Sequence, residues 1–86
     1  MELPELIRES RRALPGMMNQ KKVCELIRRR YPGVRLSQVT FSKIEHGRTW
    51  PSCLSMAAIA DVLGIPGDDV MQALVAHLKR METENE

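Results

Sequence analysis

Proline and glycine breaks divide this chain into short segments, and within each segment the apolar residues follow helical spacing. The breaks lie at Pro15-Gly16, Pro32-Gly33, Gly47 and Gly64. Between them, apolar residues recur at i, i+3 and i+4, and no stretch alternates as a strand would. The sequence therefore predicts a single all-α domain over residues 1–82. It has five helices over roughly residues 3–14, 19–31, 37–46, 52–63 and 67–81, followed by an acidic, frayed tail at 83–86.

The core of this domain should be aliphatic. The chain has 86 residues, enough for one domain, but only one Trp, one Tyr and one Phe. A domain of this size buries roughly 60–65% of the surface of its unfolded chain, so a partner would add stability. The residues expected to face inward are Leu3, Leu6, Ile7, Leu14, Val23, Leu26, Ile27, Tyr31, Phe41, Ile44, Cys53, Met56, Ile59, Ala60, Leu63, Val70, Leu74, Leu78 and Met81.

Neither the cysteines nor the apolar segments indicate export or a membrane. Cys24 and Cys53 have no metal-ligand spacing, which predicts free core thiols in a reducing cytoplasm and neither metal nor cofactor. The start of the chain lacks a basic region followed by an apolar run. The longest apolar stretch, residues 53–65, is interrupted by Asp61 and is too short to span a bilayer. We expect a cytoplasmic protein without membrane contact.

Charge is divided unevenly along the chain. Residues 1–50 contain eleven Lys/Arg against five Asp/Glu, a balance of +6, whereas residues 51–86 contain two against six, a balance of −4. A basic region beside an acidic one indicates one face for a polyanion and another face kept away from it. A solvated run of charges is the simpler alternative.

The start of the second helix contains an unusual pair of lysines. Asn19 is a suitable cap, yet Lys21 and Lys22 occupy the first turn, where the helix dipole disfavours cations. A helix N-terminus with two ammonium groups is well suited to a phosphate. Two solvated surface lysines are an equally open interpretation.

The stretch "SQVTFSKIEHG", residues 37–47, has two contrasting sides. Ser37 is a capping residue and Gly47 a helix stop, and Phe41 and Ile44 are spaced to face the core. The other side contains polar residues and one exposed branched residue, Val39, which a purely structural helix would not need.

Three segments in order resemble the phage-repressor and Cro-type helix-turn-helix family, also called XRE. They are "NQKKVC", "SQVTFSKIEHG" and "WPSCLSMAAIADVLGIPGDDVM", and the resemblance extends from about residue 3 to residue 71. It implies a five-helix, lambda-repressor-like DNA-binding domain. The segment between Cys24 and Leu36 is longer than in most relatives by about seven residues, or two helical turns, which return within roughly 20° of the same phase. This elongated form, with "YPGVRLSQVT", is similar to the POU-specific domain.

The resemblance also implies roles for individual residues. Gln38 would read a base, since its amide can bind adenine at two points, Val39 would contact a thymine methyl, and Lys43 would reach a guanine or a phosphate. Gln20 would buttress Gln38. The backbone-contacting or supporting residues would be Asn19, Gln20, Lys21, Lys22, Arg28, Ser37, Thr40, Ser42 and Arg48.

Four further expectations concern structure. The resemblance implies that Glu45 forms an ion pair with an arginine of the first helix, Arg11, or Arg12 if the first loop shifts the alignment. The run Arg28–Arg30 either complements the dipole at the helix C-terminus or contacts phosphate. Trp50 either covers the core or lies along the DNA. Spare apolar residues on the last two helices indicate an isologous homodimer, unless they only widen the core face. That interface would comprise Leu54, Val62, Met71 and Val75.

The function implied by the resemblance is sequence-specific binding of double-stranded DNA. We expect a small prokaryotic or phage repressor that binds a palindromic operator as a dimer, released by a regulatory protein such as an antirepressor. The antitoxin of a toxin–antitoxin pair is the alternative, and it would bind a toxin. An enzyme is disfavoured because His46 and His77 are far apart in the sequence and have no nucleophile motif beside them.

Overall fold

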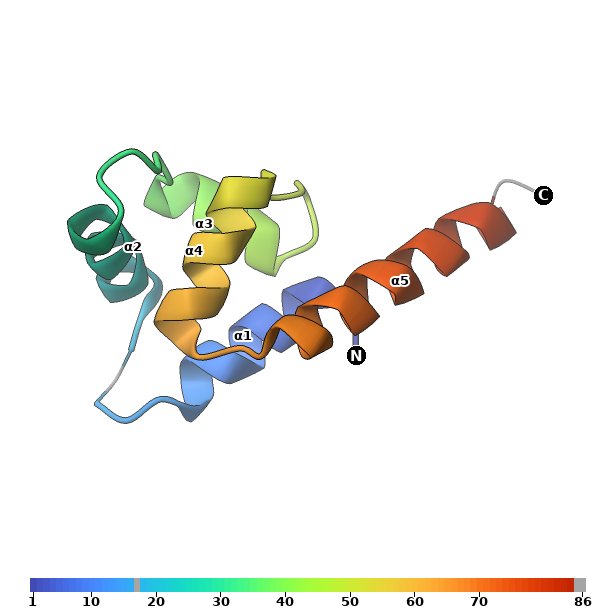
Figure 1. Cartoon of the computed structure of the whole chain (residues 1–86), viewed down its shortest axis with the longest axis horizontal. Coiled ribbons are helices and arrows are strands. Elements are labelled where there is room, and N and C mark those ends of the chain that lie inside the picture. The colour runs from blue at the N-terminus through green and yellow to red at the C-terminus, as the bar shows by residue number, and fades with distance from the viewer. Residues whose placement is uncertain (17, 85–86) are drawn as a thin grey trace.

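The computed structural model describes residues 1–16 and 18–84, and these residues form five α-helices and no strand (Figure 1). The helices are α1 (Leu3–Ala13), α2 (Gln20–Arg30), α3 (Gln38–Glu45), α4 (Cys53–Leu63) and α5 (Gly67–Glu84). The predicted all-α class is therefore confirmed. Helix α5 differs from its predicted bounds. It continues through Thr83 and Glu84, which were expected in a frayed tail, and residues 85–86 of that tail lie outside the described residues.

Side-chain caps define where three helices begin. Asn19, Ser37 and Ser52 each accept a hydrogen bond from the backbone N–H three residues later, at 2.9, 3.1 and 3.2 Å. Such a cap stabilises a helix by about 1 kcal/mol compared with alanine. At the other end of α4, Gly64 adopts the left-handed conformation with φ of 70°, which a side chain would strain. These residues therefore set where the helices begin and end through contacts within one turn of the chain.

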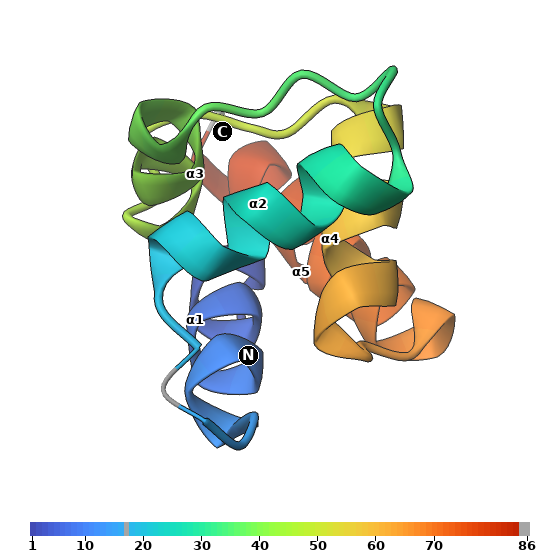
Figure 2. The ribbon, with the colours of Figure 1, turned by 90° about the vertical axis from the view of Figure 1, so that its left-hand side faces the viewer.

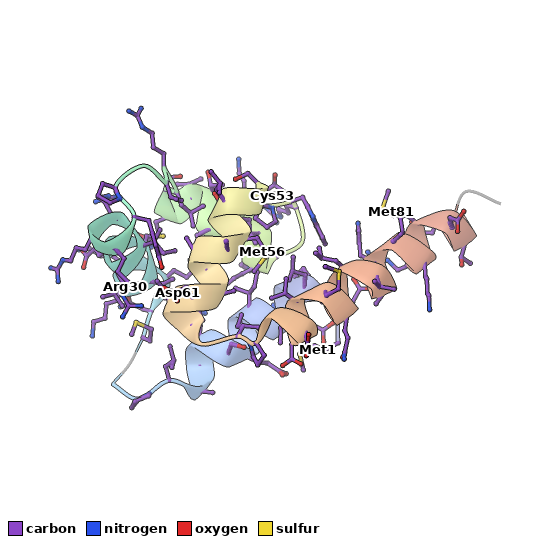
Figure 3. The ribbon with its side chains drawn as sticks, viewed as in Figure 1. Met1, Arg30, Cys53, Met56, Asp61 and Met81 are labelled. Carbon is purple, nitrogen blue, oxygen red and sulfur yellow. The ribbon has the colours of Figure 1, made fainter. Side chains whose placement is uncertain are left out.

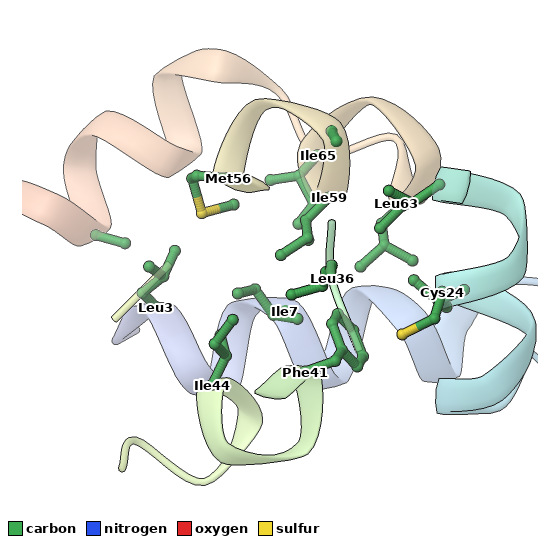
Figure 4. Close-up of a cluster of buried hydrophobic side chains, with 14 residues drawn as sticks. Leu3, Ile7, Cys24, Leu36, Phe41, Ile44, Met56, Ile59, Leu63 and Ile65 are labelled. Atoms are coloured by element: carbon green, nitrogen blue, oxygen red, sulfur yellow. The ribbon is translucent and has the colours of Figure 1, made fainter. Parts of the chain in front are cut away.

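The first four helices enclose a common core (Figures 2 and 4). Helix α1 packs against α3, α4 and α5, and α2 packs against α3 and α4. The only phenylalanine, Phe41, is fully buried, and aliphatic side chains surround it. The buried hydrophobic set is Leu3, Ile7, Val23, Cys24, Ile27, Leu36, Phe41, Ile44, Met56, Ala58, Ile59, Leu63, Ile65 and Ala73.

Helix α5 projects beyond this body, contrary to the packing expected from the sequence (Figure 1). Of its residues only Ala73 is buried, whereas Leu78 and Met81, both expected in the core, are 61% and 45% exposed. The described residues measure 43 × 24 × 20 Å, with a Cα radius of gyration of 12.9 Å. A compact domain of this length would have a radius of about 12 Å. Helix α5 leaves its last turns uncovered because it extends past its partner α1.

The two cysteines lie in different environments. Cys24 is buried as expected, but Cys53 is exposed, so the expectation of two core thiols was wrong for Cys53. Cys53 is the first residue of α4, one turn before the buried Met56, and the helix has not yet reached the core there. Burial raises the pKa of the Cys24 thiol, which keeps it protonated and unreactive.

An aromatic disulfide reagent should therefore modify the Cys53 thiol of the folded protein rapidly and the Cys24 thiol only after unfolding. A Cys53→Ser variant should show almost no reaction until denaturant is added, whereas Cys24→Ser should react like the native protein. Absorbance of the released thiolate measures both rates. Equal reaction of both thiols in the folded state would contradict the burial of Cys24.

The end of α2 is attached to α4 through Asp61. The Tyr31 hydroxyl donates a hydrogen bond to Asp61 Oδ2, and Arg30 Nη1 lies 3.4 Å from the same oxygen (Figure 3). Tyr31, expected on the inner face, is instead 37% exposed, because this bond holds it at the surface. The bond to Asp61 raises the pKa of Tyr31, since a phenolate could not donate it. The stability that this hydrogen bond contributes is present below pH 10, and it is lost as pH rises through the raised pKa of Tyr31.

Candidate nucleic-acid interface

Helix α3 separates its side chains cleanly into two sides. Phe41 and Ile44 are 0% and 1% exposed and attach the helix to α1 and α2. On the other side Gln38 and Lys43 are exposed, and Val39 is 67% exposed. An isolated branched residue this open contributes nothing to the core, so its side chain is available to a partner.

The exposed side of α3 borders a shallow hollow of about 540 Å³. Around this hollow lie the three predicted base-contacting residues together with three of the predicted backbone-contacting or supporting residues: Gln38, Val39 and Lys43, and Gln20, Ser42 and Arg48. They come from α2, α3 and the loop after α3. The Arg48 N–H donates to the Lys43 carbonyl at 2.9 Å, which holds the start of that loop against α3. The face combines amide, apolar and cationic groups.

A buried ion pair fixes α3 to α1 beneath this face. Glu45 is 1% exposed and receives two hydrogen bonds from the Arg11 guanidinium, from Nε to Oε2 at 2.7 Å and from Nη2 to Oε1 at 3.0 Å. The pair therefore involves Arg11 and not the alternative, Arg12. The hydrogen bond to Glu45 raises the pKa of Arg11 above its ordinary value. Fork-like pairing of this kind fixes both partners in orientation as well as distance.

Two more bonds extend the Glu45 network. Arg11 Nη1 donates to the Met18 carbonyl at 3.1 Å, and Arg8 Nη1 donates to the Glu45 carbonyl at 3.3 Å. The sequence-based interpretation missed Arg8. Its signal was its position three residues before Arg11, which places both guanidinium groups on one side of α1.

Gln20 also belongs to this network, a contact that the sequence did not indicate. Its Nε2 donates to Glu45 Oε1 at 3.2 Å, whereas the resemblance implied support of Gln38. Gln20 and Gln38 share only the hollow. The buried Glu45 carboxylate therefore orients the Gln20 amide, and α1, α2 and α3 meet at this carboxylate.

The predicted cationic residues of α2 lie on the surface. Lys21, Lys22 and Arg28 are all exposed, and the two lysines lie in the first turn of α2, which Asn19 caps. A second hollow, of about 430 Å³, separates the end of α2 from the start of α3, with Arg28 and Arg35 on its rim and the buried Leu36 in its wall. The elongated connection thus places two guanidinium groups beside the Ser37 cap. In that cap Ser37 Oγ also donates to Thr40 Oγ1 at 3.0 Å.

Trp50, in the loop after α3, packs on a residue of α5. Its ring stacks on His77, with centroids 4.2 Å apart and planes inclined by 22°. The loop after α3 is thereby connected to α5 by an aromatic contact that the sequence did not indicate. The two histidines are in different environments, because His46 Nδ1 lies 2.8 Å from the Ser42 carbonyl at the end of α3.

The predicted dimer residues differ in their exposure. Leu54 on α4 is 74% exposed, and Met71 and Val75 on α5 are 60% and 40% exposed. Val62 is partly buried and packs against the core. The sequence could not separate these cases, because α4 is apolar on most of its circumference.

In residues 1–16 and 18–84 no group of three or more His, Cys, Asp or Glu side chains is arranged to hold a metal ion. Nor does any helix within those ranges combine the length and apolar character needed to cross a bilayer.

Comparison with known proteins gives no match to a family model, to a curated protein or to a solved structure. The conclusions below therefore depend on the geometry and chemistry of the chain itself.

Proposed function

We propose that this chain is a sequence-specific, non-catalytic DNA-binding regulator that uses α2 and α3 as a helix-turn-helix of the lambda-repressor-like type. In this proposal α3 enters the major groove of a palindromic operator. The chain acts as a small repressor of prokaryotic or phage origin by occupying that site as a dimer.

One observation carries the proposal. The solvent side of α3 contains Gln38, Val39 and Lys43, while Phe41 and Ile44 on the opposite side attach the helix to the body. A helix is about 10–12 Å in diameter, and the major groove is about 12 Å wide. Donor, acceptor and apolar groups on one exposed side of a helix are the set needed to distinguish base edges.

The cations around α3 suit the phosphate backbone. Lys21 and Lys22 at the start of α2, and Arg48 after α3, are exposed, and in this proposal they contact phosphates beside the groove. About half to two-thirds of protein–DNA hydrogen bonds go to the backbone, and these set register without reading sequence. The carboxylate of Glu45, the acidic residue of α3, is buried and paired with Arg11, so it does not oppose the phosphates.

In-vitro selection of bound sequences from a random double-stranded library tests the proposal directly. We expect a palindromic sequence whose half-sites lie about one helical turn apart. Recovery of no sequence preference, or of no bound DNA at low salt, would contradict it. Genes beside this one encoding a toxin would favour the antitoxin alternative.

Replacing Lys22 with glutamine should weaken binding to all DNA sequences alike. Each lost phosphate contact removes about one unit from the slope of log affinity against log salt. Arg28→Gln should do the same if the elongated connection contacts the backbone. Titrations at several salt concentrations measure the slope, and Lys79→Gln on α5 is the control expected to leave it unchanged. An unaltered slope in both test variants would place phosphate contacts elsewhere.

A further inference from the structure

The three consecutive arginines at the end of α2 have different surroundings. Arg30 lies beside Asp61 of α4, with 3.4 Å between Nη1 and Oδ2. Arg28 lines the second hollow, between the end of α2 and the start of α3, whereas Arg29 is exposed and is not among the residues that line this hollow. Successive side chains of a helix point about 100° apart, so the run divides among three directions. Of the three, only Arg28 borders the start of α3.

A second guanidinium group comes to the same hollow from the connection between α2 and α3. Figure 2 shows this connection crossing from the end of α2 to the start of α3. Arg35 is exposed on it, and the adjacent Leu36 is buried and attaches the connection to the core. No acidic residue lines the hollow, and no carboxylate of residues 1–16 or 18–84 forms an ion pair with Arg28 or Arg35. Two positive charges therefore border one hollow without a counter-charge from the described part of the chain.

The start of α3 adds a hydrogen-bond donor to this hollow. Ser37 Oγ accepts from the Thr40 N–H at 3.1 Å and donates to Thr40 Oγ1 at 3.0 Å. A hydroxyl has one proton to donate, and that of Thr40 is not used in this pair. Thr40 is exposed and lines the hollow together with Ser37. Two guanidinium groups and a hydroxyl donor suit a phosphate diester, because its charged oxygens only accept hydrogen bonds.

Helix α3 separates this second hollow from the hollow beside the proposed base-reading residues. Thr40 lines the second hollow and Ser42 the other, and at 100° per residue the two positions lie roughly 160° apart around the helix. Val39, which is 67% exposed, lies between them on the solvent side. Helix α3 is therefore a ridge with Val39 at its crest and a hollow on each side. The major groove is about 12 Å wide and has a sugar-phosphate strand along each edge, so a ridge that enters it meets one strand at each hollow.

We propose that the second hollow is a phosphate site, in which Arg28, Arg35 and the Thr40 hydroxyl hold one phosphate of the DNA strand on that side of the groove. The inference rests on the proposed function and adds to it the strand that the other hollow does not reach. Most of the residues that line the second hollow belong to residues 24–36, so the site is a product of the elongated connection. It contributes affinity and register without base preference, because a phosphate carries no sequence information.

Binding to selected operators that each carry one uncharged methylphosphonate tests the inference. With the native chain, neutralising one phosphate in each half-site, on the strand beside the second hollow, should weaken binding. In Arg35→Gln the same neutralisation should have no further effect. This variant should bind all sequences roughly fivefold more weakly at 0.15 M salt, and the slope of log affinity against log salt should fall by about one unit. Thr40→Val should also weaken binding but keep the native slope, since it removes a hydrogen bond and no charge.

Arg29→Gln is the matched control, because it removes the same charge from the residue next to Arg28 but outside the hollow. It should keep the native slope and the native sensitivity to neutralisation at every phosphate. The base preference should be unchanged in all of these variants. Unchanged helix content and melting temperature would show that each variant is folded, as expected for exposed side chains.

Failure of this inference and failure of the proposed function give different results. If Arg28→Gln and Arg35→Gln both bind DNA with the native slope and the native sensitivity at every phosphate, the phosphate site is overturned and the function stands. If the native chain binds no DNA, titration with inorganic phosphate decides. A shift of the Thr40 amide resonance that is absent in Arg35→Gln would keep the site as one for a free phosphate and refute the DNA function. No shift in the native chain would overturn both.

Discussion

Replacing Glu45 with alanine should lower the free energy of unfolding by about 3–5 kcal/mol, because it leaves a largely buried guanidinium without its partner. Glu45 is 1% exposed and the Arg11 side chain 14% exposed, so water can replace the lost bonds only in part. Gln20 also loses its acceptor. Denaturant unfolding followed by circular dichroism measures the change.

Asp61→Ala is the control for this experiment. Asp61 accepts from an arginine and from the Tyr31 hydroxyl, but Arg30 and Asp61 are 57% and 51% exposed, and such an ion pair is worth about 0–1 kcal/mol. Tyr31 is also exposed, so water can replace its lost bond. Since a domain has only about 5–15 kcal/mol in total, Glu45→Ala could populate the unfolded state strongly. Glu45→Gln, which retains the side-chain shape and one acceptor, then serves as a milder variant. A loss in both Glu45 variants no larger than that of Asp61→Ala would show that the network does not hold α3 in place.

Replacing Gln38 with alanine should weaken binding to the selected operator by about 1–3 kcal/mol and relax the preference at a single base pair in each half-site. The Gln38 amide lies on the exposed side of α3 and is free to donate and accept at one base, as adenine requires. Competition against a set of operators mutated at each position measures both affinity and preference.

A matched control is Gln72→Ala, which removes an exposed glutamine from α5 and should leave the base preference unchanged. Gln38→Ala should retain its salt dependence, since no phosphate contact is lost. An unchanged preference at every position in the Gln38 variant would remove this residue from the reading face. The proposal for α3 would then depend on Val39 and Lys43 alone.

Local features of the fold could be predicted closely. The caps Asn19, Ser37 and Ser52 and the stop at Gly64 act within one turn of the chain, so the residues themselves contain the information. The buried and exposed sides of α3 could also be predicted, because Phe41 and Ile44 are its only large apolar residues apart from Val39. Cys53 was misplaced because periodicity does not show how far into α4 the core begins.

The supporting network under the candidate site was only partly predictable. Family resemblance indicated that Glu45 pairs with an arginine of α1. The hydrogen bonds that Gln20 and Arg8 donate to Glu45 depend on how α1, α2 and α3 cross. A long polar side chain has several partners within reach, and only the crossing geometry selects among them. The stack of Trp50 on His77 was unpredictable for the same reason.

The amino-acid sequence by itself determined the all-α class, the helix bounds within a few residues, and which side of α3 faces solvent, since each follows from caps, breaks and spacing within one helix. Only the tertiary structure decided which apolar stripe of α5 is left open. That helix has two apolar stripes, one through Val70 and Ala73 and one through Met71 and Leu78, and its periodicity favours neither. The ion pair of Arg80 with Glu2 and the stack of His77 on Trp50 select the inner stripe, because they fix the rotation of α5 about its own axis.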